Sequence, residues 1–226
     1  MFVLGDGTRL FSSRHTILQL TSSDRLSTIV GDPQEEVVTL KDGQGIFARF
    51  NTPDCLKVDR SGNVMTVDCD KHTIHSVGKE GSVVSTLVDG KKEDDEENGD
   101  VEEGSEDETG ANARFNRPQV VVVVANGDIF LTDSDNHSIR VISPQGAVHT
   151  LCDNGQSGFA DTQGADARFN QSCGLALDTE ENLLVSDCNN HSIRRVTMTG
   201  EVSKVAGNGE KGFSDGSGEF ALQGSL

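Results

Sequence analysis

Short apolar runs alternate along the whole chain with clusters of turn-forming residues. Val120–Val124 is an unbroken apolar run, which is typical of a strand covered on both faces. Ile139 and Val141 instead alternate with polar neighbours, as in a strand with one buried face. Asn126-Gly127 separates two apolar runs and is a strong hairpin signal. No segment carries a sustained helical period with caps, so the pattern predicts an all-β protein.

One group of residues recurs along the chain. It consists of Ala-Arg-Phe-Asn, an apolar run, an Asp, a His-Ser/Thr-Ile triplet and a glycine turn. Spacings of 54 to 65 residues between copies are those of one module in a repeat fold. The tetrapeptide lies at 48–51, 113–116 and 167–170, and the matched histidines are His15, His72, His137 and His191.

Each unit divides into four short strands, which describes a blade of a β-propeller. The predicted domain spans residues 1–226, and its last strands fall at 83–88, 147–151 and 202–205. The units cover roughly 1–50, 51–116, 117–170 and 171–226. About four blades are therefore expected, in an incomplete or open ring.

The fixed offsets resemble those of the NHL-repeat family. Asp133 precedes Asn-His-Ser-Ile-Arg at 136–140, and Asp187 precedes the same five residues at 190–194. The second copy departs from this pattern, with Lys71 for the Asn and His75 for the Arg, and the first copy has Phe11 at the offset of the Asp. The resemblance implies a propeller of the six-bladed type, so this chain is expected to be a partial propeller within a larger protein.

Net charge changes the picture of possible partners. The chain carries −18 overall, and residues 91–108 contribute eleven acids and two lysines. Such a run cannot bury apolar surface, so we expect 91–108 to be a disordered loop insertion; an acidic arm for a basic partner is the alternative. The remaining excess of acids argues against nucleic-acid binding. No apolar stretch approaches the length of a membrane span, so no membrane partner is expected.

The cysteine count is five, which is odd, and no Cys-x-x-Cys occurs. Cys69 and Cys188 follow the Asp of two different units and are not expected to pair with each other. These observations favour a reducing compartment and a cytoplasmic location. A disulfide between other pairs stays open.

Recurring polar residues are the first candidates for a site. Three acids at one offset, Asp68, Asp133 and Asp187, are expected to bond the following Asn-His turn or to form a ring. A cation held by their carboxylates is the functional alternative. The histidines His72, His137 and His191 are expected to tie the second strand of each unit to the third, because zinc needs converging ligands and these lie in different blades.

Two further sets recur with the Ala-Arg-Phe-Asn group. The aromatics Phe50, Phe115 and Phe169 are predicted to fill the gaps between blades. The arginines Arg49, Arg114 and Arg168 are hypothesised to pair with the strand-end acids. Two glycine-rich stretches, 155–161 and 207–218, lack the Lys-Ser/Thr of a phosphate loop and are predicted to be blade-connecting turns.

No catalytic, cofactor-binding or metal-binding set stands out from the repeats. The sequence therefore predicts a non-catalytic scaffold that binds a protein partner. Self-association through open blade edges is a further expectation. The NHL resemblance leaves two alternatives, a metal-dependent lyase or lactonase and an RNA-binding module.

Overall fold

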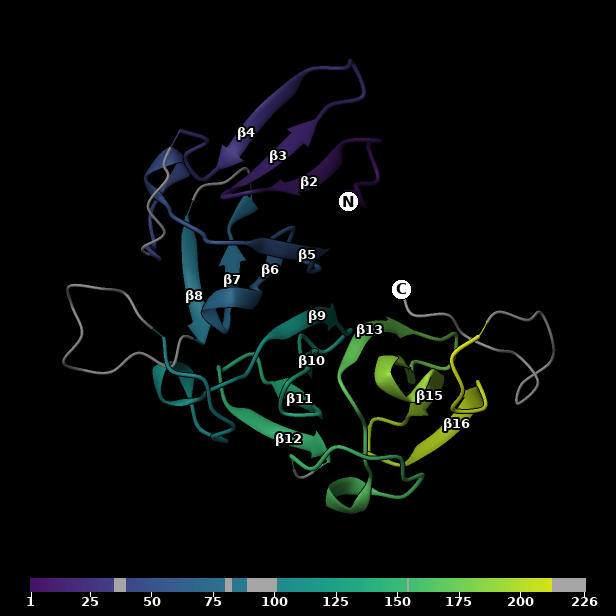
Figure 1. Ribbon diagram of the computed structural model, residues 1–226. Coiled ribbons are helices and arrows are strands. Elements are labelled where there is room, and N and C mark those ends of the chain that lie inside the picture. The colour runs from purple at the N-terminus through teal and green to yellow at the C-terminus, as the bar shows by residue number, and fades with distance from the viewer. Residues whose placement is uncertain (35–39, 80–82, 89–100, 154, 213–226) are drawn as a thin grey trace.

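Four antiparallel sheets of four strands each follow one another along the chain in an open arc (Figure 1). This computed structural model describes residues 1–34, 40–79, 83–88, 101–153 and 155–212. In each sheet the strands lie in sequence order, as the hairpin pattern predicts. The prediction of four propeller blades in an open arrangement is confirmed.

Each blade consists of four short strands, numbered along the chain. Blade 1 contains β1 Phe2–Val3, β2 Arg9–Ser13, β3 Thr16–Leu20 and β4 Leu26–Val30. Blade 2 contains β5 Pro53–Val58, β6 Val64–Asp68, β7 Thr73–Val77 and β8 Val84–Val88. Blade 3 contains β9 Pro118–Val123, β10 Ile129–Asp133, β11 Ser138–Ile142 and β12 Val148–Cys152. Blade 4 contains β13 Ser172–Leu177, β14 Leu183–Asp187, β15 Ser192–Val196 and β16 Val202–Ala206.

Strand register shows which residues are equivalent between blades. Asp133 lies opposite Ser138 at the end of its hairpin, and Asp187 lies opposite Ser192. In blade 1 the residue at this register position is Ser13, which pairs with Thr16 across a shorter turn. The sequence offset therefore misplaced the position at Phe11, because it assumed hairpin turns of equal length.

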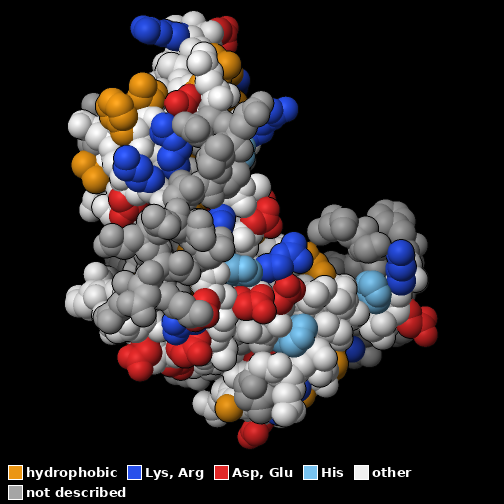
Figure 2. Space-filling view, turned by 60° about the vertical axis from the view of Figure 1, so that its left-hand side comes forward, with side chains coloured by type: hydrophobic (Ala, Val, Ile, Leu, Met, Phe, Trp, Pro, Cys, Tyr) orange, Lys and Arg blue, Asp and Glu red, His pale blue; other side chains and the backbone are white. Residues whose placement is uncertain are grey.

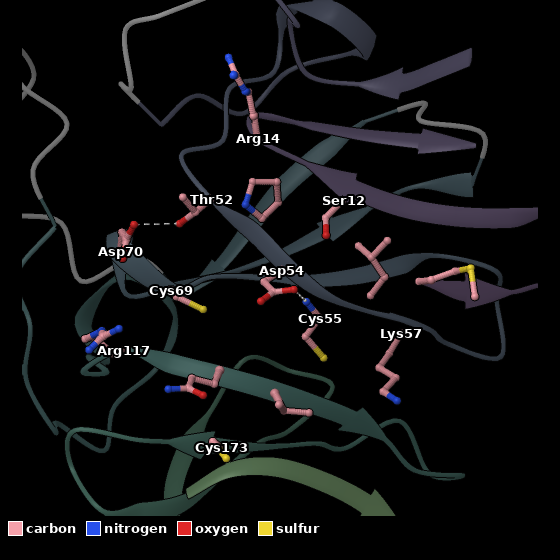
Figure 3. Close-up of a pocket in the computed structure, with 15 residues that line it drawn as sticks. Ser12, Arg14, Thr52, Asp54, Cys55, Lys57, Cys69, Asp70, Arg117 and Cys173 are labelled. Carbon is pink, nitrogen blue, oxygen red and sulfur yellow. Dashed lines mark hydrogen bonds between the residues drawn. The ribbon is translucent and has the colours of Figure 1, made fainter. Parts of the chain in front are cut away.

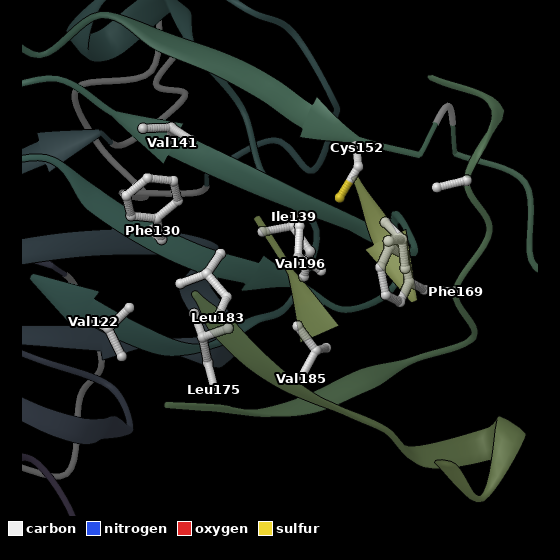
Figure 4. Close-up of a cluster of buried hydrophobic side chains, with 12 residues drawn as sticks. Val122, Phe130, Ile139, Val141, Cys152, Phe169, Leu175, Leu183, Val185 and Val196 are labelled. Carbon is white, nitrogen blue, oxygen red and sulfur yellow. The ribbon is translucent and has the colours of Figure 1, made fainter. Parts of the chain in front are cut away.

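The hydrophobic core is divided among the three junctions between neighbouring blades. Each junction contains one Ala and one Phe of the recurring tetrapeptide, and the three aromatics Phe50, Phe115 and Phe169 are 1%, 0% and 0% exposed. Figure 4 shows the junction of blades 3 and 4, where Phe169 and Cys152 lie beside Ile139 and Val196. The prediction that these aromatics fill the gaps between blades is confirmed.

Connectors, defined as residues 40–50, 101–115 and 155–169, precede blades 2, 3 and 4. Each contains a short 3-10 turn, η1 Gly45–Phe47, η4 Gly110–Asn112 or η5 Gly164–Asp166. Residues 101–108, expected to be disordered, are bonded to blade 3: Val148 N–H donates to the Glu108 carbonyl at 2.7 Å. The rest of that acidic run, residues 91–100, lies outside the described residues. None of the described helices is long and apolar enough to cross a membrane.

Candidate functional site

A cavity of about 680 Å³ opens on the concave side of the arc, against the innermost strands of the blades (Figure 3). The first strands of blades 2 and 3 supply seven of its fifteen lining residues. Its polar lining residues are Ser12, Arg14, Thr52, Asp54, Cys55, Lys57, Cys69, Asp70, Arg117, Gln119 and Cys173. Among the strand-end acids and turn histidines of the repeat, none lines this cavity.

Both signs of charge line the cavity. Asp54 accepts the Cys55 N–H at 2.8 Å, and Asp70 accepts the Thr52 hydroxyl at 3.2 Å. Arg117 lies 3.7 Å from Asp135, with half of its side chain exposed. Such a mixed polar wall can hydrogen-bond the backbone and charged side chains of a polypeptide.

Two free cysteines lie in this wall. The Cys55 Sγ accepts the Val121 N–H at 3.4 Å and thereby joins β5 to β9. Burial raises the pKa of the Cys55 thiol, and burial with nearby carboxylates raises that of Cys69 to about 12. Both thiols are therefore protonated at neutral pH, which makes them poor nucleophiles.

A disulfide joins Cys173 to Cys188 within blade 4. Cys173 lies on β13 and Cys188 begins the 3-10 turn η6 Cys188–Asn190. Cys188 thus does not pair with Cys69, as expected, and uses one of the pairings that the sequence left open. Because disulfides persist in oxidising compartments, this pair does not support the expectation of a reducing one.

The strand-end acids of blades 3 and 4 are the centres of two equivalent buried networks. Asp133 accepts the Asn116 N–H at 2.6 Å, the Asn136 side-chain amide at 2.8 Å and Arg140 Nη1 at 2.7 Å. Asp187 repeats these contacts with Asn170, Asn190 and Arg194 at 2.8, 2.8 and 2.9 Å. In blades 3 and 4 the acids therefore bond the following turn, as predicted, and also fix the start of their own blade. Asp68 of blade 2 accepts the N–H groups of Asn51 and Thr52 at the start of its blade.

A different set of arginines from the expected one pairs with these acids. Arg140 and Arg194 are fully buried, and each also reaches a connector carboxylate, Asp107 or Asp161. The hypothesis that Arg49, Arg114 and Arg168 pair with the strand-end acids is wrong. Arg49 lies 3.5 Å from Asp32, Arg114 lies 3.4 Å from Glu102, and Arg168 donates to the carbonyls of Ala165 and Ala167.

Blade 2 builds the same position without an arginine. His75 lies opposite Thr66, as Arg140 lies opposite Leu131. Its ring is buried, lies edge-on to Phe50 with 5.3 Å between ring centroids, and bonds the Thr86 hydroxyl at 3.0 Å. His75 is therefore a structural substitute for the arginine of the repeat.

Turn histidines join each blade to the next. His72 Nδ1 accepts the Arg117 N–H at 2.9 Å, and His137 Nδ1 accepts the Gln171 N–H at 3.2 Å. Histidine side chains reach the surface beside acidic ones (Figure 2), and burial lowers the pKa of His72. The expectation that they tie the second strand to the third is thus wrong, because their turns project toward the neighbouring blade.

His191, the equivalent histidine of blade 4, differs from the others. Its Nδ1 atom is buried and has no hydrogen-bond partner. Its backbone φ of 47° is nevertheless left-handed, as are those of His72 and His137.

Within the described residues, no group of three or more His, Cys, Asp or Glu side chains is placed to hold a metal ion.

Glycine-rich residues 155–161 belong to the connector between blades 3 and 4. Asn190 donates to the Gly158 carbonyl at 2.7 Å, and the Phe159 ring lies 4.2 Å from the Arg194 guanidinium carbon. The prediction of a connecting turn is confirmed there. In the second stretch, residues 213–218 lie outside the described residues.

Residues 115–142 match the model of the family described as NHL repeat. The matched segment runs from the junction aromatic Phe115 to the end of β11 and contains the Asp133–Arg140 pair. The prediction of NHL-type repeats in this chain is therefore confirmed.

Two curated proteins resemble the chain. Protein SUPPRESSOR OF QUENCHING 1, chloroplastic, from Arabidopsis thaliana is 36% identical over 104 residues, which are 45% of this chain and 10% of that protein. NHL repeat-containing protein 2 from Bos taurus is 30% identical over 158 residues, which are 65% of this chain and 21% of that protein. The chain thus spans a tenth to a fifth of the length of these relatives.

A solved structure titled as a streptogramin B lyase superposes on 89% of this chain and 52% of its own, with a TM-score of 0.59 and 17% sequence identity. At that identity the likeness shows the fold alone.

Proposed function

We propose that this chain, built of NHL-type blades, is a non-catalytic scaffold that binds a protein partner on the concave side of its arc. The proposal depends on one observation, a difference between two sets of polar residues. The recurring acids, arginines and histidines bond each other and the backbone inside and between blades, whereas the basic side chains that line the cavity lie outside the recurring group.

Arg14, Lys57 and Arg117 show this difference most clearly. None of them occurs in the recurring group, and all three line the cavity. Arg14 and Arg117 also have positive φ values of 49° and 50°, which place them at sharp bends of the backbone.

Quantitative affinity capture tests the proposal. A tagged wild-type chain, an Arg14→Glu/Arg117→Glu variant and a Lys204→Glu control would each capture proteins from an extract of the native cells. Lys204 is an exposed residue on the outermost strand of blade 4. We expect at least one protein to be lost with the concave variant and retained with the control. If every captured protein were retained equally by all three chains, the proposed surface would be wrong.

An enzyme of the lyase or lactonase type is the second candidate, since a cavity on a propeller of lyase-like fold favours it. Such an enzyme would need a group that holds or activates its substrate in the cavity, and the thiols there are protonated. Metal analysis of the purified chain discriminates the two, because stoichiometric retention of Zn²⁺ or Ca²⁺ would support the enzyme.

Self-association and compartment stay predictions. The buried, unpartnered His191 Nδ1 supports a contact on the side of blade 4 where His72 and His137 contact the next blade in their own turns. Light-scattering mass across a concentration series measures it. For the compartment, the Cys173–Cys188 disulfide favours an oxidising one. Thiol trapping in intact cells would test this.

A further inference from the structure

The outermost strands of blades 2, 3 and 4 are each covered by a connector. Val84 N–H donates to the Gly43 carbonyl at 2.7 Å, and Val202 N–H donates to the Thr162 carbonyl at 2.8 Å. The bond from Val148 to Glu108 is the counterpart in blade 3. These bonds satisfy backbone donors that an edge strand otherwise leaves exposed.

A connector carboxylate provides the second contact. Asp42 accepts the Thr86 N–H at 2.9 Å and the Thr86 hydroxyl at 2.7 Å. Asp107 accepts the Thr150 N–H at 2.9 Å and the Thr150 hydroxyl at 3.0 Å. An extended segment with one acid thus binds this edge through both backbone and side chain.

A glycine provides the third contact. Gly110 N–H donates to the Gly146 carbonyl at 3.1 Å, and Gly164 N–H donates to the Gly200 carbonyl at 2.9 Å. These connector glycines have φ values of 57° and 58°, which favour glycine over other residues. All three connectors therefore share the spacing Asp-x-x-Gly, at 42–45, 107–110 and 161–164.

In blade 1 the same edge has no connector among the described residues. Thr28 lies opposite Leu18 and Leu26 opposite Leu20, the same register that places Thr86 and Val84 under their connector. Leu26 is 61% exposed, whereas its counterpart Val84 is 1% exposed. Blade 1 thus keeps the threonine that binds the carboxylate and leaves it on an open edge.

The turn before this strand also matches. Asp24 has a φ of 58° and stands where Gly146 and Gly200 stand in the later blades, so its carbonyl is placed to accept an N–H. Exposed Arg25 adds a positive charge beside the edge in a chain whose net charge is −18. Asp24 beside Arg25 carries the opposite charge, so the preference for an acid depends on Thr28.

We propose that the open edge of β4 binds an extended acidic segment, supplied from outside these 226 residues, that contains Asp-x-x-Gly. The Asp accepts the Thr28 N–H and hydroxyl, the next carbonyl accepts the Leu26 N–H, and the Gly N–H donates to the Asp24 carbonyl. This is strand addition at a sheet edge, with the position of the acid and the glycine as the specificity. The connector of blade 3 is an internal example with all three contacts, and those of blades 2 and 4 each show two of them.

The connector of blade 3 supplies the probe. A capped peptide of residues 105–111, which contains Asp107 and Gly110, would be titrated into the isotope-labelled full chain and followed by backbone amide NMR. We expect saturable binding with the largest shifts at Leu26 and Thr28. Thr28→Val in the chain, or Asp107→Asn in the peptide, should each weaken binding about tenfold.

Thr150→Val is the matched control, because its own connector already covers that threonine, and binding should not change. The proposal is overturned if the peptide does not bind, or if Thr28→Val and Thr150→Val weaken binding equally. The sequence repeats the spacing at Asp215 and Gly218, outside the described residues. Binding that is seen only in an Asp215→Asn variant would assign the edge to this chain's own segment and would also overturn the proposal.

Discussion

Arg140 and Asp133 form a fully buried ion pair: Nη1 lies 2.7 Å from Oδ2, and both side chains are 0% exposed. Blade 4 repeats the pair with Arg194 and Asp187 at 2.9 Å. Buried charges persist in proteins when they are paired and hydrogen-bonded, and each of these pairs has further partners in the turn and the connector.

Replacing Arg140 by methionine should strongly destabilise the chain. The change leaves the Asp133 carboxylate buried without its cation, which costs about 3–5 kcal/mol of unfolding free energy. Urea unfolding followed by circular dichroism measures this loss. Arg117→Met is the control, because that side chain is half exposed and its exposed ion pair contributes about 0–1 kcal/mol. Equal losses in both variants would contradict the role given to the buried pair.

Stability should fall as pH rises through the mildly acidic range. Burial raises the pKa of Asp133 to about 6, against the lowering effect of Arg140, and also raises those of Asp68 and Asp187. Since the unfolded carboxyl has a pKa of about 3.9, the folded chain binds these protons more tightly. That contribution is complete below about pH 3.9 and is lost as pH rises to about 6.

Melting temperatures measured between pH 4 and 7 in Asp133→Asn and in wild type isolate this effect. The slope of melting temperature against pH should be less negative in the variant, whatever its absolute stability. An unchanged slope would show that Asp133 does not take up a proton in this range.

Phe115→Ala should cost about 3–5 kcal/mol of unfolding free energy, because it opens a void at the junction of blades 2 and 3. Phe47→Ala is a control of the same chemistry, since that ring is 68% exposed; its cost should stay within about 0.5 kcal/mol. Chemical denaturation of both variants gives the comparison. A small loss for Phe115→Ala would mean that the aromatic does not hold the blades together.

Thiol titration tests the disulfide. The chain purified without reductant and then denatured should expose three thiols, from Cys55, Cys69 and Cys152. Cys173→Ser/Cys188→Ser should retain three and lose about 2–4 kcal/mol of stability, the usual effect of removing such a crosslink. Five thiols in the wild-type chain would contradict the pairing.

Much of the fold could be read from the sequence because the repeat itself encodes it. The positions of Phe50, Phe115 and Phe169 follow from their offset to the apolar runs. The Arg partners of Asp133 and Asp187 could also have been found, since both follow their acid by seven residues and both end the recurring motif. The pairing was missed because it depends on hairpin register.

Other features depend on distances that the sequence does not encode. Cys173 meets Cys188 because a register shift between Ser172 and Gly174 leaves Cys173 without a strand partner beside Asp187, and Cys188 directly follows that acid. The concave cavity combines residues of all four blades, from Arg14 to Cys173, and its existence depends on how the blades are arranged. The length of each hairpin turn could not be read from the sequence either. This is why Ser13 was not recognised as the residue of blade 1 that is equivalent to the strand-end acids.

A double-mutant cycle between Asp187 and Arg194 tests most directly whether the recurring polar residues maintain the fold instead of binding the partner. Asp187→Asn, Arg194→Met and the double variant would be unfolded in urea and used in the same capture assay as the Arg14→Glu/Arg117→Glu chain. We predict a coupling free energy of at least about 1 kcal/mol between the two residues. The folded fraction of each variant should still capture the protein partner. A coupling near zero, together with loss of capture in variants that melt like wild type, would contradict the account.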